Sequence, residues 1–136
     1  MRYLLDTNTC IAAMRHHAPV LGRLASVGPA DCAISSITTY ELHTGVEKCA
    51  DPAKESAKVD LFLATVSELV FDRPAAREAG RIRALLESQG RMIGAYDVLL
   101  AGHARSIGLT LVTANVSEFS RVPGLSWENW QAPPGP

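Results

Sequence analysis

The sequence predicts an α/β fold, a three-layer α/β/α sandwich around a central, mostly parallel sheet. Short apolar runs of strand length alternate along the chain with longer segments of helical spacing. Strands that alternate with helices in this way form a parallel sheet covered by helices on both faces. The 136 residues suffice for one domain. We assign residues 1–131 to it, and residues 132–136, which include three prolines, to a disordered tail.

Strands are expected where short apolar or β-branched runs stand between turn or cap residues. The first run leads into the polar turn DTNT, and the second follows a glycine–proline pair. The last run precedes the proline-containing tail, which cannot continue a central strand. The expected strands, in chain order, are residues 2–5, 32–35, 68–71 and 109–113, with a short edge strand at 125–127.

Helices are expected where cap residues precede apolar residues at helical spacing. Pro52 follows Asp51, and proline fits the first position of a helix. Asp72 is placed to cap a helix that Gly90 ends. Between these two residues the apolar positions recur at four-three-four spacing, at Ala75, Ala79, Ile82 and Leu86. The expected helices, in chain order, begin near residues 10, 19, 38, 51, 72 and 97.

The composition is that of a globular protein, with 47% hydrophobic and 20% charged residues. No apolar stretch approaches the roughly 20 residues that a membrane span needs. The chain begins with a strand rather than an apolar signal region, so we expect a cytoplasmic protein without a membrane partner. The three cysteines lack C-x-x-C spacing and predict neither a zinc site nor a disulfide framework.

The net charge of −1 does not favour nucleic-acid binding, but the distribution of charge does. Residues 73–105 contain six arginines and only three acids. A basic surface beside an acidic centre is what binding of a phosphate backbone requires. The alternative is that each arginine is a solvated residue on a helix face.

Three acids, Asp6, Glu41 and Asp97, follow apolar runs at expected helix starts. The strands of a parallel sheet end at the same edge, so residues at such junctions meet there although they are far apart in sequence. Three carboxylates at one edge repel one another unless a cation lies between them. A divalent metal held by carboxylates is suited to phosphodiester chemistry, which is the function that this pattern favours.

Each acid also has a purely structural interpretation. The residues around Asp6 are typical of an Asx-turn or a helix cap, and Asp97 stands where an N-cap is expected. Glu41 has the spacing of a capping box with Thr38. The sequence leaves open whether these acids cap helices or share one site.

Small polar residues near the same edge support a shared site. They could hydrogen-bond to metal-bound waters or to a carboxylate, and Glu118 could add a further charge. Ligand sets made only of oxygen select Mg²⁺ or Mn²⁺ over zinc. The supporting candidates are Thr7, Asn8, Ser36, Asn115 and Glu118.

These residues lie in motifs that resemble the PIN-domain family and, within it, the VapC toxins of bacterial toxin–antitoxin pairs. The motifs run in order over nearly the whole chain: LLDTN at 4–8, ISSIT at 34–38, IGAYD at 93–97, AGHA at 101–104, LVTAN at 111–115 and VPGL at 122–125. Asp6, Glu41 and Asp97 fall on the three core acids of the family. Many PIN domains have a fourth acid, an aspartate, where this chain has Asn115.

The resemblance implies an endoribonuclease that uses Mg²⁺, with Mn²⁺ as a substitute, and usually dimerises. Asp6 and Asp97 would hold the metal, and Glu41 would be a third ligand or would orient the attacking water. A VapB-type antitoxin would silence the enzyme and would alone contact operator DNA. The implied substrate is tRNA, with the anticodon loop of initiator tRNA as the target.

Other function classes fit the sequence less well. A phospho-receiver domain would need adjacent acids after its first strand and a lysine after its last. Here Asp6 stands alone, and no lysine follows Lys58. A catalytically silent PIN-like binding module is disfavoured by the intact acids. A DNA nuclease stays open, because an acidic metal centre does not distinguish ribose from deoxyribose.

Overall fold

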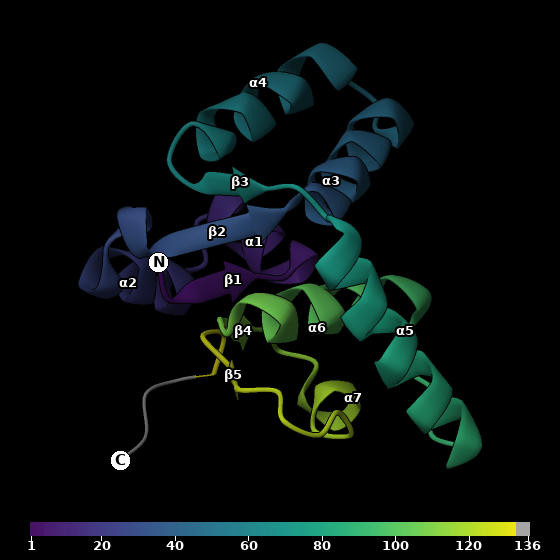
Figure 1. Ribbon diagram of the computed structural model, residues 1–136. Helices are drawn as coiled ribbons and strands as arrows, with labels where there is room; N and C mark the ends of the chain where they lie inside the picture. The colour runs from purple at the N-terminus through teal and green to yellow at the C-terminus, as the bar shows by residue number, and fades with distance from the viewer. Residues whose placement is uncertain (133–136) are drawn as a thin grey trace.

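The computed structural model describes residues 1–132, which form one parallel sheet with helices on both faces (Figure 1). The strand order is β3-β2-β1-β4-β5, and every pair is parallel. The strands are β1 (Tyr3–Leu5), β2 (Cys32–Ser35), β3 (Ser67–Leu69), β4 (Thr110–Val112) and β5 (Trp127–Glu128). The predicted α/β/α sandwich is confirmed, with a sheet that is wholly parallel. The part of the expected tail from residue 133 on lies outside the described residues.

Seven helices and a short 3₁₀ turn, Pro29–Asp31, connect the strands of the described residues. Proline stands in the first turn of α2, α4 and α5, and for Pro52 of α4 this position was predicted. The helices are α1 (Thr7–Met14), α2 (Ala18–Val27), α3 (Ser36–Lys48), α4 (Pro52–Leu63), α5 (Arg73–Ser88), α6 (Ala95–Ile107) and α7 (Val116–Phe119).

The alternation of side chains along β1 divides the core into two apolar clusters. Tyr3 and Leu5 point to the side covered by α1 to α4, where they pack with residues such as Val46. Leu4 points to the opposite side, where it packs with residues of α5 and α6 such as Ile82 and Leu100. Successive residues of a strand face opposite sides of a sheet, so three consecutive apolar residues serve both layers.

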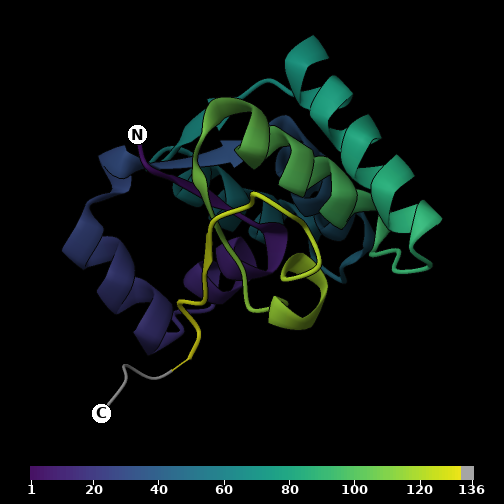
Figure 2. The same cartoon turned by 60° about the horizontal axis from the view of Figure 1, so that its bottom comes forward.

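Helices α5 and α6 lie side by side on one face of the sheet (Figure 2). Their backbones approach so closely at Gly102 that an added Cβ would lie 2.5 Å from the backbone nitrogen of Ala79. This contact fixes α6, and therefore fixes the position of the acid that its first turn carries.

Three helix starts, those of α1, α3 and α6, differ from the prediction. Helix α1 begins at Thr7 rather than near Cys10, because Asp6 already caps it by accepting the Thr9 N–H. Helix α3 begins at Ser36 rather than near Thr38, because the Ser35 hydroxyl caps it by accepting the Ile37 N–H. Helix α6 begins at Ala95 with Gly94 as its N-cap, and it follows a loop rather than a strand, so Asp97 is not a cap. The four-residue helix α7 was not predicted. Within residues 1–132 no helix is long and apolar enough to span a membrane.

Candidate active site

Asp6 stands where β1 ends and α1 begins. It is the N-cap of α1, and its Oδ1 accepts a hydrogen bond of 2.8 Å from the Thr9 N–H. The residue is 4% exposed. Burial raises the pKa of Asp6, and hydrogen bonds from Thr9 and Thr113 oppose this shift. The cap and the shared site are thus compatible, because one buried carboxylate serves both.

Glu41 is held by a residue next to Asp6. The Thr7 hydroxyl lies 2.6 Å from Glu41 Oε1 and donates to it, and the buried Thr38 hydroxyl lies 3.3 Å from Thr7 Oγ1. Glu41 lies more than one turn inside α3, so the capping-box interpretation is wrong. We call Asp6, Thr7 and Glu41 the Asp6 half of the site.

Asp97 lies against the segment after β4. The amide of Asn115 donates to Glu118 Oε2 at 2.8 Å and lies 3.4 Å from Asp97 Oδ2. The Gly94 N–H lies 3.4 Å from Glu118 Oε2. The start of α7 brings Asn115 and Glu118 together, since residues three apart share a helix face. We call Asp97, Asn115 and Glu118 the Asp97 half.

Carboxylates of both halves act on the pKa of Asp97. The pKa of Asp97 is raised to about 7, first by burial, then by the hydrogen bond and charge of Glu118, and further by the charges of Asp6 and Glu41. The pKa of Glu118 is lowered, chiefly by its hydrogen bond with Asp97. Near neutral pH Asp97 therefore carries the proton that the two carboxyl groups share.

Among the described residues, no lysine, arginine or histidine forms an ion pair with any of these four acids. Over the same residues, no three histidine, cysteine or acidic side chains stand close enough to hold an ion by themselves. The cluster therefore has excess negative charge but does not form a closed cage of protein ligands.

Gly94 leaves room for the Asp97 carboxylate. A Cβ added at Gly94 would lie 2.9 Å from Asp97 Oδ2 and 3.8 Å from Glu118 Oε2. The φ of Gly94 is −55°, which any residue adopts, so the carboxylates and not the backbone require glycine here. Sequence reasoning did not select Gly94 or Thr113 as site residues, although both lie in the motifs IGAYD and LVTAN.

Two predicted supporting residues are turned to other contacts. Asn8 is exposed and lines a separate hollow with Arg15 and Ala114. The Ser36 hydroxyl accepts a 2.9 Å hydrogen bond from the Phe71 N–H, which links α3 to the segment before α5. The structure therefore brings together Asp6, Thr7, Glu41, Asp97, Asn115 and Glu118, and leaves Asn8 and Ser36 outside the hydrogen bonds of the cluster.

Two tyrosines are the sequence neighbours of site acids: Tyr40 precedes Glu41 on α3, and Tyr96 precedes Asp97 on α6. Their hydroxyl oxygens are 2.9 Å apart. This hydrogen bond, and to a smaller extent the charge of Glu41, raises the pKa of Tyr96.

The PIN domain model matches residues 3–125, which is nearly the whole described chain. The chain belongs to the PIN domain family. Among curated relatives it is 39% identical over 130 residues to the "tRNA(fMet)-specific endonuclease VapC" of Shigella flexneri, covering 96% of this chain and 98% of the relative. It is 40% identical over 131 residues to the "Ribonuclease VapC" of Haemophilus influenzae, with the same coverage.

Solved structures of this PIN family give the same fold. DNA-bound VapBC from Salmonella typhimurium matches with a TM-score of 0.91 and 40% identity, over 96% of this chain and 98% of that one. VapBC2 from Rickettsia felis, bound to a promoter DNA fragment, matches with a TM-score of 0.86 and 38% identity, over 96% and 99%. The predicted membership in the PIN family, with VapC proteins as relatives, is confirmed.

Proposed function

We propose that this PIN domain is the endoribonuclease toxin of a toxin–antitoxin pair and that it depends on Mg²⁺ or Mn²⁺. The observation that carries the proposal is the cluster of four acids at one edge of the sheet, in which burial first, and then the three other carboxylates, raise the pKa of Asp97 to about 7. Relatives named ribonuclease and endonuclease, similar over 96% of the chain, support the reaction class.

The donor set of the cluster fits a hard divalent cation. All its side-chain donors are carboxylate, amide or hydroxyl oxygens. Among residues 1–132 no ion pair neutralises these acids, and only the charge of Arg121 acts on Glu118 from a distance. Mg²⁺ usually keeps several waters and takes one or two carboxylates, so it does not need a closed protein cage. Asp6 and Asp97 would hold the ion directly, with Glu41 as a third ligand or through a water.

The bound cation would supply charge stabilisation and a water of lowered pKa. The side chains have separate tasks in positioning the reaction. Glu41, held by the Thr7 hydroxyl, would accept a hydrogen bond from the attacking water and orient it. Asp97 would give up its proton when the cation binds. Asn115 would keep Glu118 against Asp97 and so retain a fourth acid in the site.

The proposed substrate is tRNA, with the anticodon loop of initiator tRNA as the target. The support is the name of the Shigella relative, a tRNA(fMet)-specific endonuclease. Three of the six arginines expected to form a basic surface over residues 73–105 are engaged in ion pairs: Arg81 and Arg105 bind Glu78, and Arg83 binds Glu87. Phosphate contacts would therefore come from other arginines, such as Arg73, Arg77 and Arg91.

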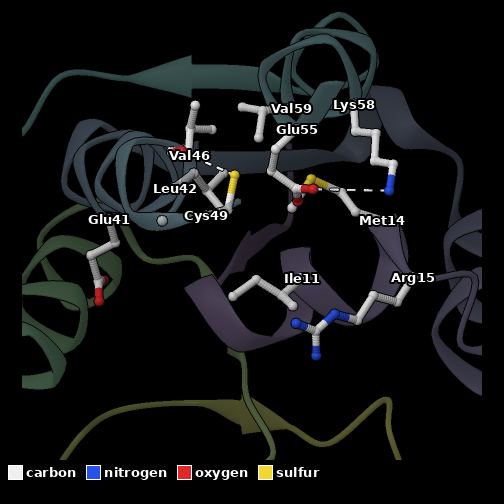
Figure 3. Close-up of a pocket in the computed structure, with 11 residues that line it drawn as sticks. Ile11, Met14, Arg15, Glu41, Leu42, Val46, Cys49, Glu55, Lys58 and Val59 are labelled. Atoms are coloured by element: carbon white, nitrogen blue, oxygen red, sulfur yellow. Dashed lines mark hydrogen bonds and ion pairs between the residues drawn. The ribbon is translucent and has the colours of Figure 1, made fainter. Parts of the chain in front are cut away.

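The proposed partner is a VapB-type antitoxin, and its docking surface is the hollow between α1, α3 and α4 (Figure 3). The hollow has a volume of about 300 Å³ and is lined by Ile11, Met14 and Val59 among others. Glu41 stands at its edge, so a segment bound there would end beside the acids. Operator DNA would be contacted through the antitoxin, in line with the DNA-bound VapBC neighbours. The homodimer implied by the resemblance stays a prediction.

The test is cleavage of purified initiator tRNA by Asp6→Asn and Asp97→Asn, with and without Mg²⁺. Asparagine also caps helices, so Asp6→Asn keeps the start of α1 intact. We expect each variant to lose more than about a hundredfold in rate, since metal charge supplies several kcal/mol of transition-state stabilisation. Asp60→Asn, at an exposed position of α4, is the matched control. Full cleavage by both site variants, or by the wild type in EDTA, would refute the proposal.

A further inference from the structure

Tyr40 and Tyr96 form an exposed aromatic pair at the rim of the acid cluster. They are 52% and 42% exposed, whereas Tyr3, Phe119 and Trp130 are buried in the core. Their ring centroids lie 5.6 Å apart at an interplanar angle of 57°, and their hydroxyl oxygens lie 2.9 Å apart. A tyrosine combines an apolar ring with a polar hydroxyl, so an exposed pair offers ring faces on which a planar ligand can lie.

The pair joins the two halves of the site. Tyr40 comes from α3, one residue before Glu41, and Tyr96 comes from α6, one residue before Asp97. The charge of Glu41 is felt at the Tyr96 hydroxyl. A group that lay on these rings would therefore be a neighbour of any phosphate bound at the acids. The hydroxyl contact holds the rings in place, which reduces the entropy that a ligand must remove on binding.

The charge balance determines which kind of contact an RNA ligand needs here. The chain has a net charge of −1, and the acids of the site repel phosphates until a cation is bound. Attraction of the phosphate backbone therefore contributes little to affinity at this edge. Stacking of a base on an aromatic ring does not depend on net charge and accepts every base, because each base has a π face.

We propose that the Tyr40–Tyr96 pair is the stacking platform for an unpaired nucleobase next to the scissile phosphate. This inference rests on the proposed endoribonuclease function and adds the residues that would hold a base of the loop beside the cleaved bond. A base inside a duplex is already stacked on its neighbours and cannot lie on the rings. The platform would thus favour single-stranded loops over RNA duplexes, whatever the identity of the base.

The test compares Tyr96→Leu with Tyr96→Phe, which keeps the ring and removes only the hydroxyl. The ligand is a fluorescein-labelled RNA hairpin with the anticodon-loop sequence, intact or with one loop base replaced by an abasic site. Binding is measured by anisotropy in EDTA, and KM by cleavage in Mg²⁺. We expect Tyr96→Leu to weaken binding of the intact loop by about 5- to 150-fold, and Tyr96→Phe by less than about threefold.

The abasic hairpin separates stacking from a structural role. If the base lies on the platform, abasic RNA at the contacted position loses affinity for the wild type, and Tyr96→Leu adds no further loss. Equal losses on intact and abasic RNA would overturn the inference and assign the pair a structural role. A change of oligomeric state in Tyr96→Leu, with RNA binding intact, would overturn it in favour of an interface between copies. If the wild type cleaves RNA, either of these results would overturn only the stacking inference and would leave the proposed function in place. A wild type that does not cleave RNA would refute both the proposed function and the inference.

Discussion

The two halves of the acid cluster are stabilised in different ways. In the Asp6 half, donors of the chain satisfy each carboxylate: the Thr9 N–H lies 2.8 Å from Asp6, and the Thr7 hydroxyl lies 2.6 Å from Glu41. In the Asp97 half, two carboxyl groups share a proton, and the pKa of Asp97 is about 7. The first half is a fixed arrangement of acceptors, and the second exchanges a proton near neutral pH.

This difference assigns different tasks to the halves. Acceptors held by short hydrogen bonds, from the Thr9 N–H to Asp6 and from the Thr7 hydroxyl to Glu41, keep their geometry whether or not a cation is present. Burial and the repulsion of three other acids keep the Asp97 carboxyl neutral, and a cation that takes the place of the proton would relieve the repulsion. We therefore expect cation binding and pH to act mainly on the Asp97 half, whereas loss of a donor acts on the Asp6 half.

Among substitutions that leave all four acids in place, the largest effect is expected from Gly94→Ala in the Asp97 half. The new Cβ would lie 2.9 Å from Asp97 Oδ2, so the carboxylate must move while the backbone, at a φ of −55°, need not. We expect cleavage to fall by roughly 10- to 100-fold, as when a supporting contact of a metal site is lost. The unfolding temperature should fall little, because the displaced atom is the end of a flexible side chain.

Gly22→Ala is the matched control for this substitution. Gly22 lies inside α2, and an added Cβ would meet nothing within 4 Å. It should leave cleavage unchanged and stabilise the helix by up to about 1 kcal/mol. Wild-type activity in Gly94→Ala would mean that the position of the Asp97 carboxylate is not critical.

A smaller effect is expected from Thr7→Val in the Asp6 half. Valine has a similar shape but no hydroxyl, so Glu41 loses its 2.6 Å donor and its fixed orientation. Loss of such an orienting contact costs about 10-fold in rate or more. Thr7→Ser keeps the hydroxyl and should retain most of the activity. The measurement is steady-state cleavage of initiator tRNA by both variants. Equal rates for Thr7→Val and Thr7→Ser would show that the hydroxyl contact does not orient Glu41.

The sequence predicted best the features that depend on neighbouring residues. Asp6 caps α1 as the DTN turn indicates, and each expected strand exists to within two or three residues at either end. Features that depend on distant contacts were missed. Ser36 pairs with the backbone of Phe71, thirty-five residues away, and Glu118 lies against the N–H of Gly94, twenty-four residues away. A four-residue helix such as α7 is too short to show periodicity.

The smallest effect is a pH-dependent change in stability without metal. The pKa of Asp97 is about 7 in the folded chain and 3.8 as the ordinary value, so the folded state binds the proton more tightly. The contribution of the Asp97 carboxyl to the free energy of unfolding is therefore fully present below about pH 4 and is lost as the pH rises to 7. Asp97→Asn stays neutral. Its unfolding temperature in EDTA should match the wild type at pH 4 and exceed it by a few degrees at pH 8. A difference in unfolding temperature between the two proteins that stays constant from pH 4 to pH 8 would contradict the raised pKa of Asp97.

The most direct test is the number of protons released when Mg²⁺ binds, measured by titration calorimetry in buffers of different ionisation enthalpy. A group with a pKa of about 7 is half-protonated at pH 7. We expect about half a proton per bound ion at pH 7, close to one at pH 6 and almost none at pH 8.5. Asp97→Asn should bind Mg²⁺ more weakly and release none. Binding without proton release at pH 6, or unchanged binding by Asp97→Asn, would contradict the exchange of a proton for a cation at Asp97.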